Sequence, residues 1–159
     1  MSFLIEPKDI QESFFIVAEK EAKKSTCLRR NCGAVLVKDN RIIGRGFNSP
    51  PGNLESQRRC HINRESLDSK VTDTTCCVHA ERRAISNALK RGNSVRGATM
   101  YFTSIDKNGK RLLSGKPYCT DCSKMSLDEG IAAWVLEHES GFIYYDAEEY
   151  NEISFNYKG

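Results

Sequence analysis

Two short fragments contain the residue types that can bind a metal ion and move protons. The first contains His79, with Glu81 two residues further on. The second contains Cys119 and Cys122 in a Cys-x-x-Cys spacing. One imidazole nitrogen and two thiolates suit zinc, and three protein ligands leave the fourth tetrahedral position for water. Together, the two fragments indicate a catalytic zinc site.

Each fragment is expected at the start of a helix. A Cys-x-x-Cys there can place both sulfurs on one side of the first turn, where the helix dipole favours their thiolates. Glu81 then lies beside the metal-bound water rather than acting as a fourth ligand. A metal lowers the pKa of water towards ~7, and a neighbouring carboxylate can relay protons to a leaving group. Hydrolysis with Glu81 as the proton carrier is therefore predicted.

Taken singly, each fragment also has an ordinary structural explanation. A histidine at a helix start commonly caps or packs, and a Cys-x-x-Cys pair can be redox-active or structural. A zinc-stabilised binding module without catalysis is therefore the rival from another class. Glu81 separates the two hypotheses, because a purely structural zinc site has no use for a carboxylate beside the metal.

Helices and strands are expected to alternate along the chain. Asp39 and Asn40 form a turn between two apolar strand-like segments. Helices covering a mixed sheet, an α/β domain, follow from this order. The expected helices are residues 7–24, 78–91 and 123–129, and the expected strands are residues 33–37, 41–47, 98–103 and 131–136. In the second helix, apolar residues recur at helical spacing: Ala80, Ala84, Ile85 and Leu89.

Residues 49–77 form a long insertion with little periodicity. Loops of this length are uncommon in a compact domain unless they are functional or tied down. The insertion contains Cys60 and His61 and ends in Cys76 and Cys77. With 159 residues, the chain is expected to be a single domain, residues 1–159, that carries this insertion.

The overall composition is that of a soluble globular protein, 39% hydrophobic and 28% charged. No apolar run approaches the ~20 residues that span a bilayer, and no secretory leader is visible. We therefore expect a cytoplasmic protein without disulfides, which the odd cysteine count of seven also favours. The net charge of +3 does not by itself indicate nucleic acid. Basic pairs such as Arg29 and Arg30 are either solvated faces or the mouth of a site for an anionic substrate.

The two fragments resemble the signature of the zinc-dependent nucleobase and nucleotide deaminases. The resemblance covers the first helix to Leu136. It implies a cytidine deaminase-like three-layer α-β-α sandwich with a mixed sheet of about five strands. One departure is Tyr118, which stands between Pro117 and Cys119 where the family usually has proline directly before the cysteine. The ligands stay intact, but the adjacent backbone that contacts the substrate is changed.

Within this family, the deoxycytidylate (dCMP) deaminase branch is the most similar. Its Gly-Tyr-Asn-Gly-x-Pro-x-Gly turn is similar to residues 46–52, Gly-Phe-Asn-Ser-Pro-Pro-Gly. The resemblance implies conversion of dCMP to dUMP and ammonia, with water attacking C4 and Glu81 protonating N3 and the departing amine. It also implies that Asn48 holds the sugar hydroxyl and that the backbone near Ala80 reads the edge of the base. Asparagine is also common in turns without any such role.

Other substrates remain open on the same chemistry. They are a free nucleoside, a purine base, a riboflavin precursor, or a base in RNA or DNA. Flipped-base enzymes need a basic channel with stacking aromatics, and no long basic tract supports one here. The resemblance further implies a homo-oligomer, and dCTP and dTTP as effectors.

Several members of the branch bind a second, structural zinc. The resemblance places its ligands at Cys27, Cys60 and Cys77, with Cys76 or His61 as the fourth. A metal bound by these residues would order a long polar insertion that has few large apolar residues of its own. Cys27 and Cys77 could instead be small buried hydrophobes.

Overall fold

The computed structural model describes residues 2–6 and 9–159 and contains one mixed sheet with four helices. The first two positions of the expected first helix, Pro7 and Lys8, lie outside the described residues. The helices are α1 (Asp9–Ala22), α2 (Ala80–Lys90), α3 (Thr120–Asp128) and α4 (Ala147–Phe155). The strands are β1 (Phe3–Ile5), β2 (Asn31–Lys38), β3 (Arg41–Phe47), β4 (Thr99–Ile105), β5 (Arg111–Leu112), β6 (Ala133–His138) and β7 (Gly141–Asp146).

The sheet has the strand order β1-β7-β6-β4-β2-β3, and β5 pairs with β4. β4 and β6 run parallel, whereas the other neighbours are antiparallel. The sheet has seven strands where about five were expected. The two shortest, β1 and β5, have three and two residues. The remaining five form the expected mixed sheet, which confirms the fold class.

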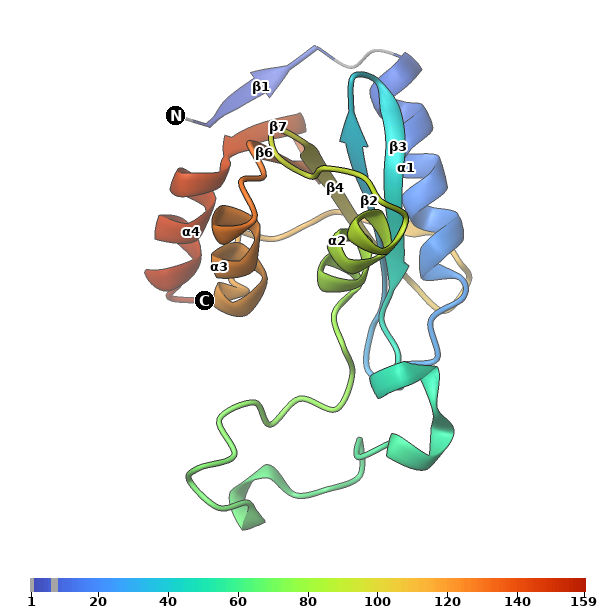
Figure 1. Cartoon of the computed structure of the whole chain (residues 1–159), viewed down its shortest axis with the longest axis vertical. Coiled ribbons are helices and arrows are strands. Elements are labelled where there is room, and N and C mark those ends of the chain that lie inside the picture. The colour runs from blue at the N-terminus through green and yellow to red at the C-terminus, as the bar shows by residue number, and fades with distance from the viewer. Residues whose placement is uncertain (1, 7–8) are drawn as a thin grey trace.

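Alternation of side chains along β2 produces two cores, one on each face of the sheet. Val35 and Val37 pack with Phe15 of α1, whereas Ala34 and Leu36 pack on the side of α2. Successive side chains of a strand point to opposite faces, so one strand can serve both layers. Figure 1 shows α1 on one side of the sheet and α2, α3 and α4 on the other, the expected three layers.

Helix α2 packs closely on strand β3 because a glycine, Gly46, lies where the two elements meet. A Cβ atom at Gly46 of β3 would lie 2.3 Å from the carbonyl oxygen of Ala80. Gly33 of β2 plays the same part under α1, where a Cβ would lie 2.0 Å from the carbonyl oxygen of Ala18. The start of α2, which carries the candidate proton carrier, is thereby seated against the strands.

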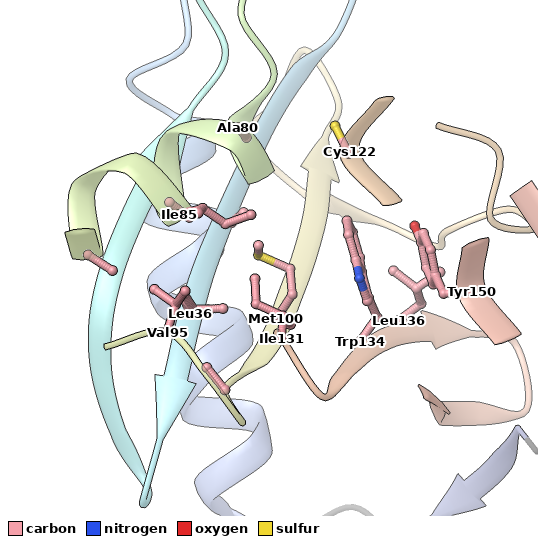
Figure 2. Close-up of a cluster of buried hydrophobic side chains, with 14 of the residues drawn as sticks. Leu36, Ala80, Ile85, Val95, Met100, Cys122, Ile131, Trp134, Leu136 and Tyr150 are labelled. Carbon is pink, nitrogen blue, oxygen red and sulfur yellow. The ribbon is translucent and has the colours of Figure 1, made fainter. Parts of the chain in front are cut away.

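Helix α4 and strand β7 complete the face that α2 and α3 cover, and neither was predicted from the sequence. Tyr150 of α4 stacks on the fully buried Trp134 of β6, with ring centroids 4.0 Å apart. Figure 2 shows these two rings side by side within the buried cluster. The contact joins α4 to the sheet beside α3.

Several expected boundaries move by two or three residues. α2 begins at Ala80 rather than at residue 78, and β6 begins at Ala133 rather than at residue 131. α3 begins at Thr120 rather than at residue 123, because the Cys119 sulfur accepts the Cys122 backbone N–H at 3.4 Å and caps the helix. Leu89, expected on the buried stripe of α2, is 42% exposed near the helix end.

The insertion leaves the body of the molecule after β3 and returns at the start of α2 (Figure 1). It contains three short 3₁₀ helices, at Pro51–Asn53, Glu55–Gln57 and Arg64–Ser66. The two ends of the insertion are joined by a hydrogen bond in which the Val78 backbone N–H donates to the Ser49 carbonyl at 2.9 Å. Arg83 of α2 adds a second hydrogen bond at this point by donating to the Pro50 carbonyl at 2.8 Å.

Candidate active site

The starts of α2 and α3 meet, and the predicted metal ligands meet with them. His79 immediately precedes α2, and Cys119 immediately precedes α3. The His79 Nδ1 atom lies 3.2 Å from Cys119 Sγ and 3.2 Å from Cys122 Sγ. With one carboxylate oxygen of Glu81 included, all four ligand atoms lie within 4.8 Å of one another.

This donor set fits zinc in number, kind and spacing. Bond lengths of ~2.0–2.3 Å and tetrahedral angles separate neighbouring ligand atoms by about 3.5 Å, close to the distances between His79 and the two sulfurs. Cys122 is fully buried, whereas His79 and Cys119 are half-buried. Access from solvent is therefore confined to one side of the group.

Hydrogen bonding prepares one of the sulfurs as a thiolate. The pKa of Cys119 is lowered to about 5, first by its hydrogen bond with Cys122 and then by that with His79. The hydrogen bond with Cys119 raises the pKa of His79 to about 9. The pKa of Cys122 is raised by its hydrogen bond with Cys119 and by burial. A divalent cation at this position would displace the protons on His79 and Cys122, as metal ligation requires.

Glu81 lies in the first turn of α2 and is only 6% exposed. Burial, followed by the charge of Cys119, raises the pKa of this carboxyl group above its ordinary value. A carboxyl group with a raised pKa can both accept and donate a proton near neutral pH. The arrangement is therefore that of a general acid and base beside a metal position.

The candidate ligands His79 and Cys119 line a pocket whose more exposed lining residues include arginines. Asn48 and Ala80, the two predicted substrate contacts, both line it. Among the described residues that line the pocket, Glu81 is the only one with a carboxylate. The lining includes four arginines, Arg29, Arg30, Arg59 and Arg64. Such a pocket suits a ligand with a polar base at one end and a negative charge at the other.

Several residues that line this pocket were not predicted from the sequence, among them Tyr150, Arg59 and Arg64. Tyr150 contributes from α4, and Arg59 and Arg64 contribute from the insertion. Arg59 belongs to a basic pair that is visible in the sequence, but the spacing does not reveal that the insertion folds towards the site. Tyr150 has no comparable signal, because it reaches the pocket only through the packing of α4.

The side-chain amide of Asn48 forms hydrogen bonds with the loop between α1 and β2 through both its oxygen and its nitrogen. Its Oδ1 accepts the Cys32 backbone N–H at 2.9 Å and the Ser25 hydroxyl at 2.5 Å. Its Nδ2 donates to the Arg30 carbonyl at 2.8 Å. An amide nitrogen has two N–H donors, so one remains for a ligand in the pocket.

A second cluster consists of thiols alone. The sulfurs of Cys60, Cys76 and Cys77 lie within 4.8 Å of one another, and burial together with the nearby Cys27 thiol raises the pKa of Cys77. Three of the predicted cysteines therefore converge, and Cys27 is near Cys77 but outside this group. His61, the alternative fourth ligand, is exposed and lies outside this group. Partial burial acts to raise the pKa of Cys60, but hydrogen bonds with Arg58 and Cys76 hold it below its ordinary value.

Comparison with known proteins identifies the family. Residues 8–138 match the model of the cytidine and deoxycytidylate deaminase zinc-binding region. The chain is 30% identical to the deoxycytidylate deaminase of Mycobacterium phage D29 over 138 residues, 83% of this chain and 97% of that protein. It is 37% identical to the deoxycytidylate deaminase of Schizosaccharomyces pombe over 83 residues, 48% of this chain but only 25% of the relative.

A solved structure of similar sequence supports the same assignment. The dCMP deaminase of cyanophage S-TIM5, in complex with dCMP and dUMP, is 25% identical, with a TM-score of 0.59 over 82% of each chain. The matched family region, residues 8–138, contains every ligand of the candidate metal site. The chain therefore belongs to the cytidine and deoxycytidylate deaminase family, whose shared feature is a zinc-binding region.

Proposed function

We propose that this protein is a zinc-dependent enzyme that hydrolyses dCMP to dUMP and ammonia. The observation that carries the proposal is the buried Glu81 carboxyl beside His79, Cys119 and Cys122, at the base of a pocket edged by arginines. The phage and yeast relatives, both called deoxycytidylate deaminases, support this choice of substrate.

His79 Nδ1 and the sulfurs of Cys119 and Cys122 would hold the catalytic zinc. When bound, zinc lowers the pKa of water and so supplies a nucleophile at neutral pH. Glu81 would take the proton released by the attacking water and pass it to ring N3, and would then carry the hydroxyl proton of the C4 adduct to the departing amine. Its burial excludes bulk water from these transfers.

Two further residues would orient the nucleotide. Asn48 has one amide N–H left to donate to the sugar hydroxyl, because its other polar positions hold the α1–β2 loop. The backbone of Ala80, at the start of α2, would read the polar edge of the base. Ala80 lines the pocket between Glu81 and His79.

The thiol cluster would hold a second, structural zinc. Cys27, Cys60, Cys76 and Cys77 would supply four sulfurs, the ligand set of many structural zinc sites. Cys76 is the fourth ligand in this proposal, because its sulfur lies with those of Cys60 and Cys77. The metal would fasten the insertion to the start of α2.

We expect a homo-oligomer that dCTP and dTTP regulate, in the reducing cytoplasm, where the seven cysteines form no disulfides. In residues 2–6 and 9–159, no helix combines the length and apolar character needed to cross a membrane. Sedimentation of the purified protein, with and without dCTP or dTTP, tests the assembly and its regulation.

A substrate panel tests the central proposal. Ammonia release should be far faster with dCMP than with deoxycytidine, because arginine contacts to a phosphate are strong. Equal efficiency on the nucleoside and the monophosphate would remove dCMP as the substrate and leave the deamination chemistry standing. Faster reaction with a single-stranded DNA or RNA would instead place the enzyme among those acting on nucleic acid.

The zinc ligands are tested by metal content. Each single substitution of a ligand should cause loss of both the catalytic zinc and the activity, because catalytic zinc sites use three protein ligands. The variants are His79→Ala, Cys119→Ser and Cys122→Ser. Cys32→Ser is the matched control for zinc content, since this buried thiol lines the same pocket but lies outside the ligand group. A ligand variant that lacks this zinc but stays active would contradict the assignment.

A further inference from the structure

Tyr118, the residue that departs from the family pattern, lies at the edge of the pocket. It immediately precedes Cys119 and lines the pocket together with Glu81, although its side chain is 51% exposed. Its hydroxyl oxygen accepts a hydrogen bond from Arg30 Nη1 at 3.1 Å. The bond joins the α1–β2 loop to the segment before α3.

The Arg30–Tyr118 pair has donors to spare. Guanidinium has five N–H donors, and a phenol can accept one hydrogen bond while donating another. Within the described part of the chain, no carboxylate forms an ion pair with Arg30. Among the same residues, the Tyr118 hydroxyl accepts a hydrogen bond from Arg30 but donates none. Both side chains can therefore donate to a ligand.

The neighbouring arginines are less available or less enclosed. The Arg59 side chain donates to the carbonyls of Ser56 and Arg58 within its own loop. Arg29 and Arg64 are exposed, whereas Arg30 is half-buried. Charge-assisted hydrogen bonds strengthen as water is excluded. Arg30 is thus the pocket arginine best placed to bind an anion strongly.

Both members of the pair are held in position before any ligand binds. The Asn48 amide fixes the backbone around Arg30, with hydrogen bonds to the Arg30 carbonyl at 2.8 Å and the Cys32 N–H at 2.9 Å. The Tyr118 ring packs against Tyr157, with centroids 5.7 Å apart. Preorganised donors lose little entropy on binding.

We propose that Arg30 and Tyr118 bind the phosphate of the nucleotide as one unit, which makes Tyr118 a specificity-determining residue. The inference rests on the proposed function, because it names the group that selects the monophosphate at that site. Arg30 donates to the Tyr118 oxygen and to the phosphate, and the polarised Tyr118 hydroxyl donates to a second phosphate oxygen. A neutral nucleoside makes neither contact.

Tyr118→Phe tests the unit because it keeps the ring and removes only the hydroxyl. For the zinc-loaded enzyme, KM for dCMP should rise roughly ten-fold, the effect of one hydrogen bond to a charged group. The kcat for dCMP and both constants for deoxycytidine should stay unchanged. Arg30→Gln should raise KM for dCMP further, and adding Tyr118→Phe to it should have less effect than in the wild type.

Tyr157→Phe is the matched control, because Tyr157 contacts the same ring but does not line the pocket. It should leave both substrates unaffected. An equal loss with dCMP and deoxycytidine in Tyr118→Phe would show that Tyr118 only supports the loop, and an unchanged KM for dCMP would show that its hydroxyl does not reach the phosphate. Either result overturns the inference.

Binding measurements separate this inference from the proposed function. Calorimetric titration of the wild type with dUMP and with deoxyuridine should show tighter binding of dUMP, and Tyr118→Phe should reduce that preference. A wild type that binds dUMP preferentially but does not deaminate dCMP would overturn the proposed function alone. A preference for dUMP that survives in both Tyr118→Phe and Arg30→Gln would overturn the inference alone.

Discussion

At the level of a single residue, Glu81 is both buried and close to the candidate zinc ligands. It is 6% exposed, and it lies within 4.8 Å of three side chains that suit zinc. Burial raises its pKa, which brings a carboxyl group closer to the pH at which an enzyme must both take up and release protons. Its place beside the ligands explains why a residue so costly to bury is present.

Glu81→Gln should retain the fold and the zinc yet lower turnover by several powers of ten. The amide keeps the shape of the side chain but cannot carry a proton, and general acid–base catalysis alone contributes ~10²–10⁴ in rate. Turnover of dCMP and zinc content should be measured together, with Glu139→Gln, an exposed carboxylate in the β6–β7 turn, as the control. Near-normal activity with full zinc content would show that Glu81 is not the proton carrier.

The four residues of the candidate metal site could be grouped from the sequence because their signal is local. A His-x-Glu and a Cys-x-x-Cys each bring their members together within one helical turn. The structure then places the two fragments 3.2 Å apart. Arg30 and Tyr118 lie 88 positions apart in the chain. No spacing rule predicts such a contact, which depends on how two loops meet.

At the level of elements, helix α4 and strand β7 were not predicted from the sequence, for different reasons. Acidic residues dominate the start of α4 and leave it without a clear apolar stripe in the sequence, whereas β7 contains an apolar run, Phe142 to Tyr145, that was not used. In the structure, α4 is fixed by Tyr150 stacking on Trp134, and β7 pairs with β6. The β2–β3 hairpin was predicted because its turn, Asp39 and Asn40, is defined by adjacent residues, both of which adopt positive φ.

Gly46→Ala should destabilise the protein through the contact between β3 and α2. A Cβ there would meet the Ala80 carbonyl oxygen at 2.3 Å and the Ala84 backbone nitrogen at 2.6 Å, so the helix must shift. Overpacking of this kind costs about 1–3 kcal/mol. Chemical denaturation should therefore show a lower midpoint, and the displaced start of α2 should also reduce activity.

Gly115→Ala is the control for this substitution, because a Cβ there meets nothing within 4 Å and the residue is not among the glycines with positive φ. It should leave the denaturation midpoint almost unchanged. If both variants were equally stable, β3 and α2 would be free to separate, and the close seating of α2 would not matter for the site.

At the level of the whole molecule, the pocket depends on segments from nearly the full length of the chain. The α1–β2 loop, the insertion, the starts of α2 and α3, and α4 all contribute lining residues. The family region ends at residue 138, so Tyr150 and the rest of α4 lie beyond it. Such a pocket forms only once the three layers have packed, which couples folding to substrate binding.

Freshly reduced protein should contain close to two zinc ions per chain, one at the candidate active site and one that ties down the insertion. Cys60→Ser should lower this to one, because it removes a sulfur from the group formed with Cys76 and Cys77. Structural zinc contributes on the order of 10 kcal/mol in small peptides, so limited proteolysis should cut the variant's insertion faster. Binding of dCMP should weaken while the catalytic zinc remains.

His61→Ala is the matched control, since it alters the exposed neighbour of Cys60 that lies outside the thiol group. It should keep both metals, whereas Cys76→Ser should lose the same metal as Cys60→Ser. Because Arg59 donates its backbone N–H to the Cys76 sulfur at 2.9 Å, losing that metal should also loosen the arginine edge of the pocket. Elemental analysis that finds a single zinc in fully active, reduced wild type would contradict the second zinc and leave these four cysteines as thiols without a metal.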